Sequence, residues 1–273
     1  MRTRVGHPAQ RFFEGLTGVS GRYYHDTNLV SKLGAVVVPL FELVYRDCIA
    51  MYGKYGYNPS QAAEYVLHHL AIGRPLHHHN IPPHLYWKAQ PATARAAASA
   101  DGADAFTRAD RGWAEGMHLV DRFVKNTYEV LSPLNELTAE AALTEHSFLT
   151  PDRKVQRSRF GEGETAVEVV VNSGDSAHEY RSKLGQTVLL PRYGFCVESP
   201  TFVAFHASSW AGRRYDSSVL FTLRSLDGKP LGQSNRVRVY HGFGDDQIAF
   251  GGKVQSVPKE DVIGNIGALP SNN

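Results

Sequence analysis

The sequence predicts an α/β region followed by an all-β region. Residues 35–45, "AVVVPLFELVY", form a nearly continuous apolar run, and residues 59–73 carry an apolar stripe at helical spacing. From about residue 138 the pattern changes to short apolar runs separated by turns. A buried parallel strand followed by a helix is typical of α/β folds, whereas short strands at regular spacing are typical of an antiparallel sandwich.

The composition favours a folded chain with an uncharged partner. The 273 residues are 42% hydrophobic, and 29 basic residues against 27 acidic ones give a net charge of +2. A chain of this length buries a sizeable core, and its charge balance indicates neither a nucleic acid nor a membrane as partner. Cys48 and Cys196 follow no metal or redox spacing, so both are expected to be buried thiols.

No segment of the sequence is long and apolar enough to cross a bilayer. The longest apolar run is interrupted by Pro39 and Glu42 and falls short of the roughly 20 residues required. The first residues carry positive charge without the apolar stretch of a signal peptide. The chain as it stands is expected to be cytoplasmic, although a longer parent could carry a signal, and its localisation stays unknown.

The first region predicts one strand and two helices. Residues 35–45 are expected to form a strand that is covered on both faces. Pro59 suits the first turn of the following helix, and Gly73 with Pro75 ends it. A second helix is expected from about Arg111 to Leu131, with residues 90–110 as an exposed loop. The apolar stripe of that second helix would consist of Trp113, Met117, Val120, Val124 and Leu131.

The second region predicts a series of antiparallel strands. "VQRSRF" and "TAVEVVVN" flank "GEGE", which indicates a hairpin with a glycine-containing turn. "TVLLPRYGFCVES" adds two short strands, and "TFVAFHA", "SVLFTLRS" and "RVRVYHGF" continue the series, with a turn at "LDGKP". We therefore expect a β-sandwich over residues 136–258 and a tail over 259–273.

The end of the strand at 35–45 is the first candidate site. Tyr45, Arg46 and Asp47 follow its apolar body, and catalytic groups of parallel barrels lie at the C-terminal ends of strands. Asp47 is the candidate catalytic residue, and Tyr45 and Arg46 are candidates for binding substrate hydroxyls. Alternation would place Glu42 and Arg46 on one face and Tyr45 and Asp47 on the other. An alternative is structural, since an Arg-Asp or Glu-Arg pair could fasten the strand to its neighbour.

Glu14 supplies a second carboxylate, in "RFFEG" at the start of a glycine-containing loop. Glycoside hydrolysis commonly uses two carboxylates, about 5–10 Å apart, on either side of the reacting carbon. If "RFFEG" ends the preceding strand, Glu14 and Asp47 could face the same mouth. The alternative is an ordinary loop or helix-capping carboxylate.

Histidines and aromatic residues gather between residues 68 and 87. His79 and Trp87 are candidates for substrate binding, and "IPPHLYW" could be a sugar-stacking loop or a hydrophobic plug between domains. The histidines form no His-Glu-x-x-His motif, and adjacent helical histidines point in different directions, so we expect no metal site. No phosphate-cradling glycine loop is present, and no cofactor is expected.

Four stretches together resemble the C-terminal part of bacterial glycoside hydrolases: "VVPLFELVYRDC", "GRPLHHHNIPPHLYW", "TEHSFLTPDRKVQRSRFGEGETAVEVVVN" and "LPRYGFCVES". In these enzymes a (β/α)8 barrel precedes a β-sandwich, and the nearest likeness is to families distantly related to endo-α-N-acetylgalactosaminidases. The resemblance implies a carbohydrate-active protein whose pocket includes Asp47 and, with it, Glu14, and whose substrate is an oligosaccharide or glycoconjugate. Arg46 departs from the histidine expected in the family.

Length limits what this chain can contain. A complete barrel needs about 200–250 residues, whereas some 135 precede the predicted sandwich. We therefore expect residues 1–135 to be the last strand-helix units of a (β/α)8 barrel, and the chain to be a fragment that is inactive alone. The competing hypothesis is a non-catalytic carbohydrate-binding or scaffolding β-sandwich module.

Overall fold

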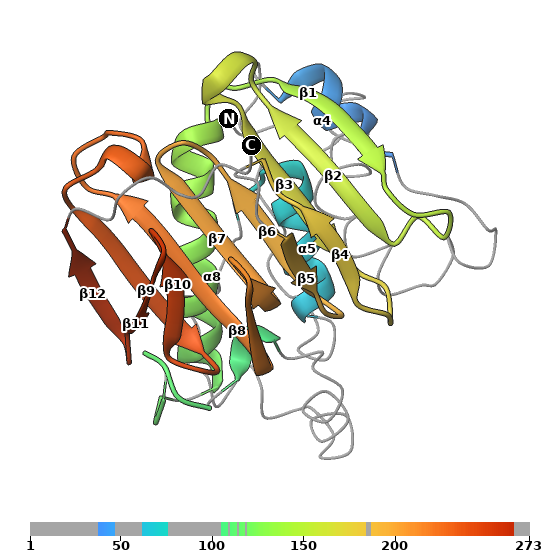
Figure 1. Ribbon diagram of the computed structural model, residues 1–273. Helices are drawn as coiled ribbons and strands as arrows, with labels where there is room; N and C mark the ends of the chain where they lie inside the picture. The colour runs from blue at the N-terminus through green and yellow to red at the C-terminus, as the bar shows by residue number, and fades with distance from the viewer. Residues whose placement is uncertain are drawn as a thin grey trace.

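The described part of the chain is mostly antiparallel β-sheet with few helices (Figure 1). A computed structural model describes residues 38–46, 62–75, 105–108, 110–113, 115–117, 119–183 and 187–264. In these ranges every strand pair is antiparallel, and no part of a parallel barrel is seen. The all-β region predicted from about residue 138 is confirmed, since its first strand begins at Leu143.

One ten-stranded sheet dominates the structure, and its main path runs β1-β2-β3-β6-β7-β8-β9-β12. These strands are β1 Leu143–Phe148, β2 Val155–Phe160, β3 Val167–Asn172, β6 Phe195–Glu198, β7 Phe202–Trp210, β8 Arg213–Ser225, β9 Val237–Phe243 and β12 Glu260–Ile263. The hairpin of β4 His178–Arg181 and β5 Thr187–Leu190 leaves this path and joins β7 at Leu189 and Ser209. A separate hairpin consists of β10 Gln247–Phe250 and β11 Lys253–Ser256.

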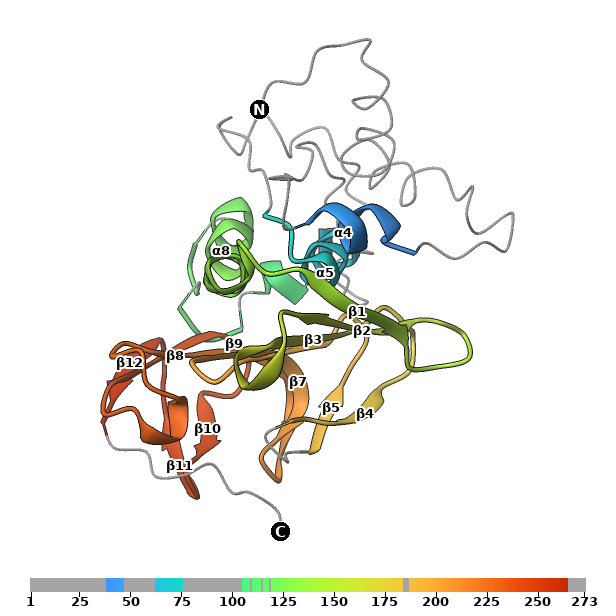
Figure 2. The same ribbon diagram turned by 90° about the horizontal axis from the view of Figure 1, so that it is seen from above.

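The two faces of the sheet are covered differently (Figure 2). Helices α4 Leu40–Tyr45, α5 Ala62–Ile72 and α8 Leu119–Thr138 lie on one face, with the short 3₁₀ helix η3 Ala105–Thr107 between them and the sheet. The hairpins β4-β5 and β10-β11 lie over the other face. Two further 3₁₀ turns, η4 Gly163–Thr165 and η5 Leu231–Gln233, connect strands.

The central strands are mostly apolar because both of their faces are buried. On β3, Val169 and Val171 point into the core under the helices, whereas Val170 points into the core on the opposite face. Phe205 and Trp210 stack in this second core at 4.2 Å between ring centroids. A strand covered on both sides reads as a continuous apolar run rather than as alternation, which is why "VEVVVN" and "FVAFHA" are recognisable in the sequence.

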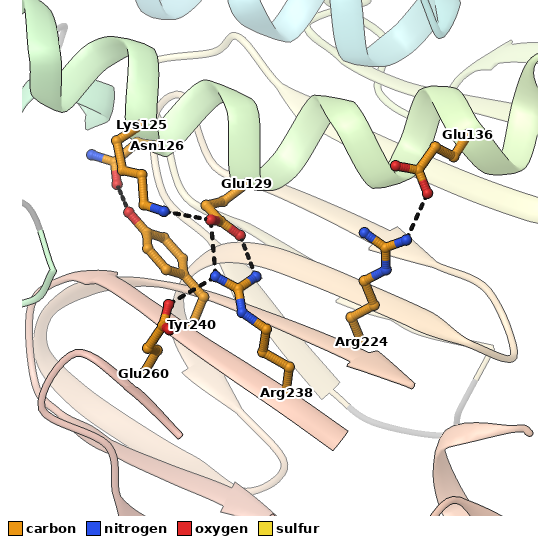
Figure 3. A network of polar contacts seen from close by, with 8 residues as sticks. All are labelled: Lys125, Asn126, Glu129, Glu136, Arg224, Arg238, Tyr240 and Glu260. Carbon is orange, nitrogen blue, oxygen red and sulfur yellow. Dashed lines mark hydrogen bonds and ion pairs between the residues drawn. The ribbon is translucent and has the colours of Figure 1, made fainter. Parts of the chain in front are cut away.

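Helix α8 is joined to the sheet by a network of polar contacts, most of them partly buried or exposed (Figure 3). The Glu129 carboxylate accepts two hydrogen bonds from Arg238 of β9, at 2.6 and 3.0 Å, and one from Lys125 at 2.7 Å. One turn earlier, the amide oxygen of Asn126 accepts the Tyr240 hydroxyl proton at 2.7 Å. The cations of Arg238 and Lys125 keep the pKa of Glu129 below its usual value although burial opposes this shift.

The prediction of a strand over residues 35–45 is wrong at Leu40–Tyr45, which forms the short helix α4. Its outward side chains, Leu40 and Val44, are exposed, whereas Glu42 and Arg46 are buried at the helical spacing of four residues. Pro39 stands directly before the helix, where its fixed φ and missing N–H are tolerated. In this helix Glu42 contacts Arg74 and Arg46 contacts Thr138, and such tertiary contacts override the β propensity of the segment.

The second predicted helix is present, but it begins and ends later in the chain than the predicted range from Arg111 to Leu131. Gly112 and Gly116 have φ of 82° and 80°, and α8 begins only at Leu119 and continues through Pro133 to Thr138. Among the described side chains, its buried apolar stripe is Phe123, Val130, Leu131 and Leu134, of which only Leu131 was expected. The loop expected over residues 90–110 is also wrong at Ala105 and Phe106, which are buried in η3.

Glu129→Gln should lower the free energy of unfolding by about 2–3 kcal/mol, because it leaves the half-buried Arg238 guanidinium with the more exposed Glu260 in place of its buried carboxylate partner. Glu136→Gln is the matched control, since its ion pair with Arg224 is more exposed and should contribute less than about 1 kcal/mol. Urea unfolding of both variants measures the difference. Equal losses would contradict the assignment of Glu129 as the anchoring residue.

His206 should make the protein less stable at acid pH. Its ring is buried between Phe195 and Phe243, with Nδ1 2.9 Å from the Tyr193 carbonyl oxygen and Nε2 2.9 Å from Ser218 Oγ. Burial, helped by the positive charge of Arg108, lowers the pKa of His206 from 6.5 to about 4. Between these two pH values the unfolded chain binds a proton that the folded chain does not, so stability falls as pH drops from 6.5 to 4.

In His206→Gln this part of the pH dependence, at most about 3 kcal/mol, should disappear. Chemical unfolding at pH 7, 6, 5 and 4 measures it, with His178→Gln on β4 as the control. An unchanged slope in His206→Gln would show that other groups, such as His146, control the acid response.

Candidate functional site

A cluster of buried charged side chains surrounds the end of α4. In the sequence, this end directly precedes the predicted catalytic residue Asp47. Arg74, which follows α5, is fully buried and donates a hydrogen bond from Nη2 to the Glu42 carboxylate. This is the structural Glu-Arg pair that the sequence left open as an alternative. It joins α4 to the end of α5, two elements that are 32 residues apart in the chain.

Arg46 joins the same helix to the end of α8. Its Nη2 donates to the Thr138 carbonyl oxygen at 3.0 Å and contacts Thr138 Oγ1 at 2.7 Å, and the guanidinium lies 5.2 Å from the centre of the Phe160 ring. An arginine that binds the last carbonyl groups of a helix also opposes the negative end of its dipole. Burial, together with the nearby Arg74, lowers the pKa of Arg46 to about 10.

Gly73 allows this cluster to close. It ends α5 with φ of 59°, a conformation that favours glycine, as the sequence predicted. A Cβ atom at this position would lie 2.9 Å from both Arg46 Nη2 and the Phe160 ring. Any other residue would therefore force the Arg46 guanidinium or the Phe160 ring to move.

The described residues include two of the predicted site residues. Arg46 is buried in the cluster, whereas Tyr45 is 42% exposed, so the two side chains face different surroundings. The two predicted catalytic carboxylates, Asp47 and Glu14, and the predicted substrate-binding residues His79 and Trp87 lie outside the described residues.

A second candidate site is a pocket that the sequence did not indicate, here called the Glu198 pocket. It has a volume of about 360 Å³ and lies between η4, the β6-β7 turn and η5. Its wall surface is mostly apolar, as is typical of small-molecule sites, although five of the ten described lining residues have polar side chains. The apolar lining is Ala166, Pro200, Pro230 and Leu231, and the polar lining is Glu164, Lys183, Glu198, Ser199 and Gln233.

Glu198 is the buried ionisable residue of this pocket. It is 3% exposed, and its Oε2 accepts the backbone N–H of Lys183 at 3.1 Å. Across the β3-β6 pairing it stands directly opposite Glu168, so both carboxylates lie on the face away from the helices. Like charges in directly opposed positions destabilise a sheet unless they are compensated.

Glu168 has two compensating partners. The Tyr180 hydroxyl of β4 donates a hydrogen bond to Oε1, and the Lys183 ammonium lies 3.7 Å from Oε2. Burial and the bond to Glu168 raise the pKa of Tyr180, so this hydroxyl stays protonated. Cys196 is a free thiol on the same face. It is buried, as the sequence predicted, and burial raises its pKa.

The η5 wall of the pocket is held by hydrogen bonds rather than by apolar contacts alone. The Leu231 N–H donates to the Pro200 carbonyl oxygen at 2.7 Å, which ties η5 to the β6-β7 turn. At the base of this loop the Asp227 carboxylate accepts the hydroxyl protons of Ser225 and Ser234 at 2.9 and 2.8 Å. These bonds, led by that of Ser234, keep the pKa of Asp227 well below its usual range.

Comparison of the sequence with protein families and with curated proteins finds no match. Among the described residues, no group of three or more His, Cys, Asp or Glu side chains could hold a metal ion. In the same ranges, no helix combines the length and the apolar character that a membrane span requires.

The Glu198 pocket was missed because its parts are distant in the sequence. Glu198 ends the strand "FCVE", and Leu231 follows the turn "LDGKP"; both segments were recognised, but as a strand and a turn. The sequence signal that could have indicated this pocket is a glutamate inside an apolar strand, as at positions 168 and 198.

Glu42→Gln should destabilise the protein by about 3–5 kcal/mol, because it removes the buried carboxylate that the fully buried Arg74 guanidinium contacts. Replacing both partners, as Glu42→Leu with Arg74→Met, should recover most of this loss, since no charge is then left buried alone. Urea unfolding of wild type, both single variants and the double variant measures the coupling. A Glu42→Gln loss below about 0.5 kcal/mol would contradict the pair's structural role.

Proposed function

We propose that the chain is part of a glycoside hydrolase, with Asp47 and Glu14 as its catalytic carboxylates. The described residues would then be the β-domain that follows a (β/α)8 catalytic barrel, with helices that lie between the two. The proposal rests first on the sequence resemblance, which covers about half of the chain.

The observation that supports it best is the anchoring of the chain directly before Asp47. Arg46 is fixed to Thr138 and Phe160, and Glu42 to Arg74. A catalytic group must be held within a fraction of an ångström by rigid supports. This buried cluster supplies such a support next to position 47 in the sequence.

The charge of the cluster also suits this role. Among the described residues of the cluster, Arg46 and Arg74 are positively charged and Glu42 is negatively charged. Neighbouring positive charge favours the ionised form of a carboxyl group. An ionised carboxylate is the form that attacks or stabilises the anomeric carbon, so we assign that role to Asp47 and the general-acid role to Glu14.

The exposed surface of α4 fits a helix that lies between two layers. Leu40 and Val44 are 64% and 53% exposed on the side away from the sheet. Apolar side chains of this size on one short helix are typical of a surface that a further part of a protein covers.

The competing role, a non-catalytic carbohydrate-binding module, finds less support. Flat sugar-binding faces use exposed aromatic rings, but the exposed tyrosines of the described part, Tyr45 and Tyr128, both lie on helices. On the described strands and on the turn after β8, the exposed large apolar residues are Leu226, Val254 and Val262. None of these three is aromatic.

The test is hydrolysis of a panel of α- and β-linked aryl glycosides by the longest natural reading frame that contains this chain. Asp47→Asn and Glu14→Gln should each lower kcat by about 10²–10⁴-fold, the usual contribution of acid-base or nucleophilic groups. Asp216→Asn, on the exposed part of β8, is the control and should leave kcat unchanged.

Near-normal turnover in folded Asp47→Asn would remove Asp47 from the mechanism. No hydrolysis by the full reading frame, combined with saturable binding of an oligosaccharide, would instead favour the non-catalytic role.

A further inference from the structure

We propose that the Glu198 pocket binds a small neutral molecule that is mainly aliphatic, such as an alcohol or ester with a short alkyl chain. Binding of this kind is independent of any glycosidic reaction at Asp47 and Glu14. Three features of the pocket support this ligand: its preformed walls, the apolar surface of these walls, and the contacts that its buried polar side chains make within the protein.

The walls of the pocket are held in place by the fold. The Leu231 N–H donates to the Pro200 carbonyl oxygen at 2.7 Å, which joins two of the walls. At the base of the same loop, the Asp227 carboxylate accepts the Ser234 hydroxyl proton at 2.8 Å. The proline rings at positions 200 and 230 also fix the backbone φ there. A volume of about 360 Å³ lies at the lower end of known ligand pockets, so the ligand should be small.

Most of the surface that faces the pocket is apolar. Leu231 forms one wall and belongs to the core on the hairpin side of the sheet. Ala166, Pro200 and Pro230 add further apolar surface. An alkyl chain that covers these walls leaves water, and this favours binding in proportion to the apolar area covered. None of the described lining residues is aromatic, which disfavours a sugar ring that needs a stacking partner.

The buried polar side chains of the pocket already have partners within the protein. Glu198 Oε2 accepts the backbone N–H of Lys183 at 3.1 Å. Ser199 Oγ donates to the Phe202 carbonyl oxygen at 3.1 Å and accepts the Phe202 N–H at 2.9 Å. The ammonium group of Lys183 lies 3.7 Å from the Glu168 carboxylate. A neutral alkyl chain needs neither a counter-charge nor a hydrogen bond from these groups, whereas a charged group that entered the pocket would lose its water.

The test is a titration of the full chain at pH 7 with n-butanol, n-pentanol and n-hexanol, followed in ¹⁵N amide spectra. The amide signals of Leu231, Gly232 and Gln233 should shift in a saturable way, with a Kd of about 1 mM for n-hexanol. Each added methylene group should tighten binding about threefold to fourfold, as its removal from water predicts. Hexylammonium and hexanoate should bind at least about threefold more weakly than n-hexanol, because a charged end stays in water and holds the adjacent methylene groups outside the pocket.

Leu231→Ala removes one wall of the pocket and should weaken n-hexanol binding at least about fivefold. Leu226→Ala, on the exposed turn after β8, is the matched control and should leave the affinity unchanged. If Leu231→Ala does not fold, the chain-length series and the charged probes on the wild-type protein still decide the matter. Shifts confined to other regions, an affinity independent of chain length, a charged probe that binds as tightly as n-hexanol, or a methyl glycoside that displaces n-hexanol would overturn the proposal. Unchanged affinity in folded Leu231→Ala would do the same.

Discussion

The structure depends on one constraint: the central strands of the sheet are buried on both faces. Val169 and Val171 contact the core under the helices, and Val170 contacts the core under the hairpins. Neither layer alone could keep β3, β6 and β7 from water. Helix α8 and the hairpins therefore have to dock together, and the Glu129–Arg238 contact fixes where α8 lies on the sheet.

Buried charge is a second constraint, and several buried charged side chains contact partners from distant elements. Glu42 meets Arg74, Arg46 meets the end of α8, and Glu168 meets Tyr180 and Lys183. Such contacts add less net stability than apolar packing, because both charges lose their water. Their value lies in fixing the orientation of one element on another, since a shifted helix would leave a charge unpaired.

The sequence predicts the sheet well because local signals coincide there. Glycine turns and paired apolar runs identify the β2-β3 hairpin, and Gly73 marks the end of α5 correctly. Helix α4 could not be predicted, because its conformation depends on partners such as Thr138, 92 residues away. Pairing within the sheet was also beyond the sequence: β5 and β6 are neighbours in the chain, yet β5 pairs with β4 and β7, and β6 with β3 and β7.

The two ends of the sheet path affect how copies of the protein behave toward one another. An edge strand offers unpaired N–H and C=O groups that could join the sheet of another copy. Strand β12 is only four residues long and exposes Glu260 and Asp261, and β1 has an irregular register between Leu143 and Glu145. A short acidic strand at one end and an irregular one at the other discourage sheets from joining edge to edge, which keeps so β-rich a protein from aggregating through its strands.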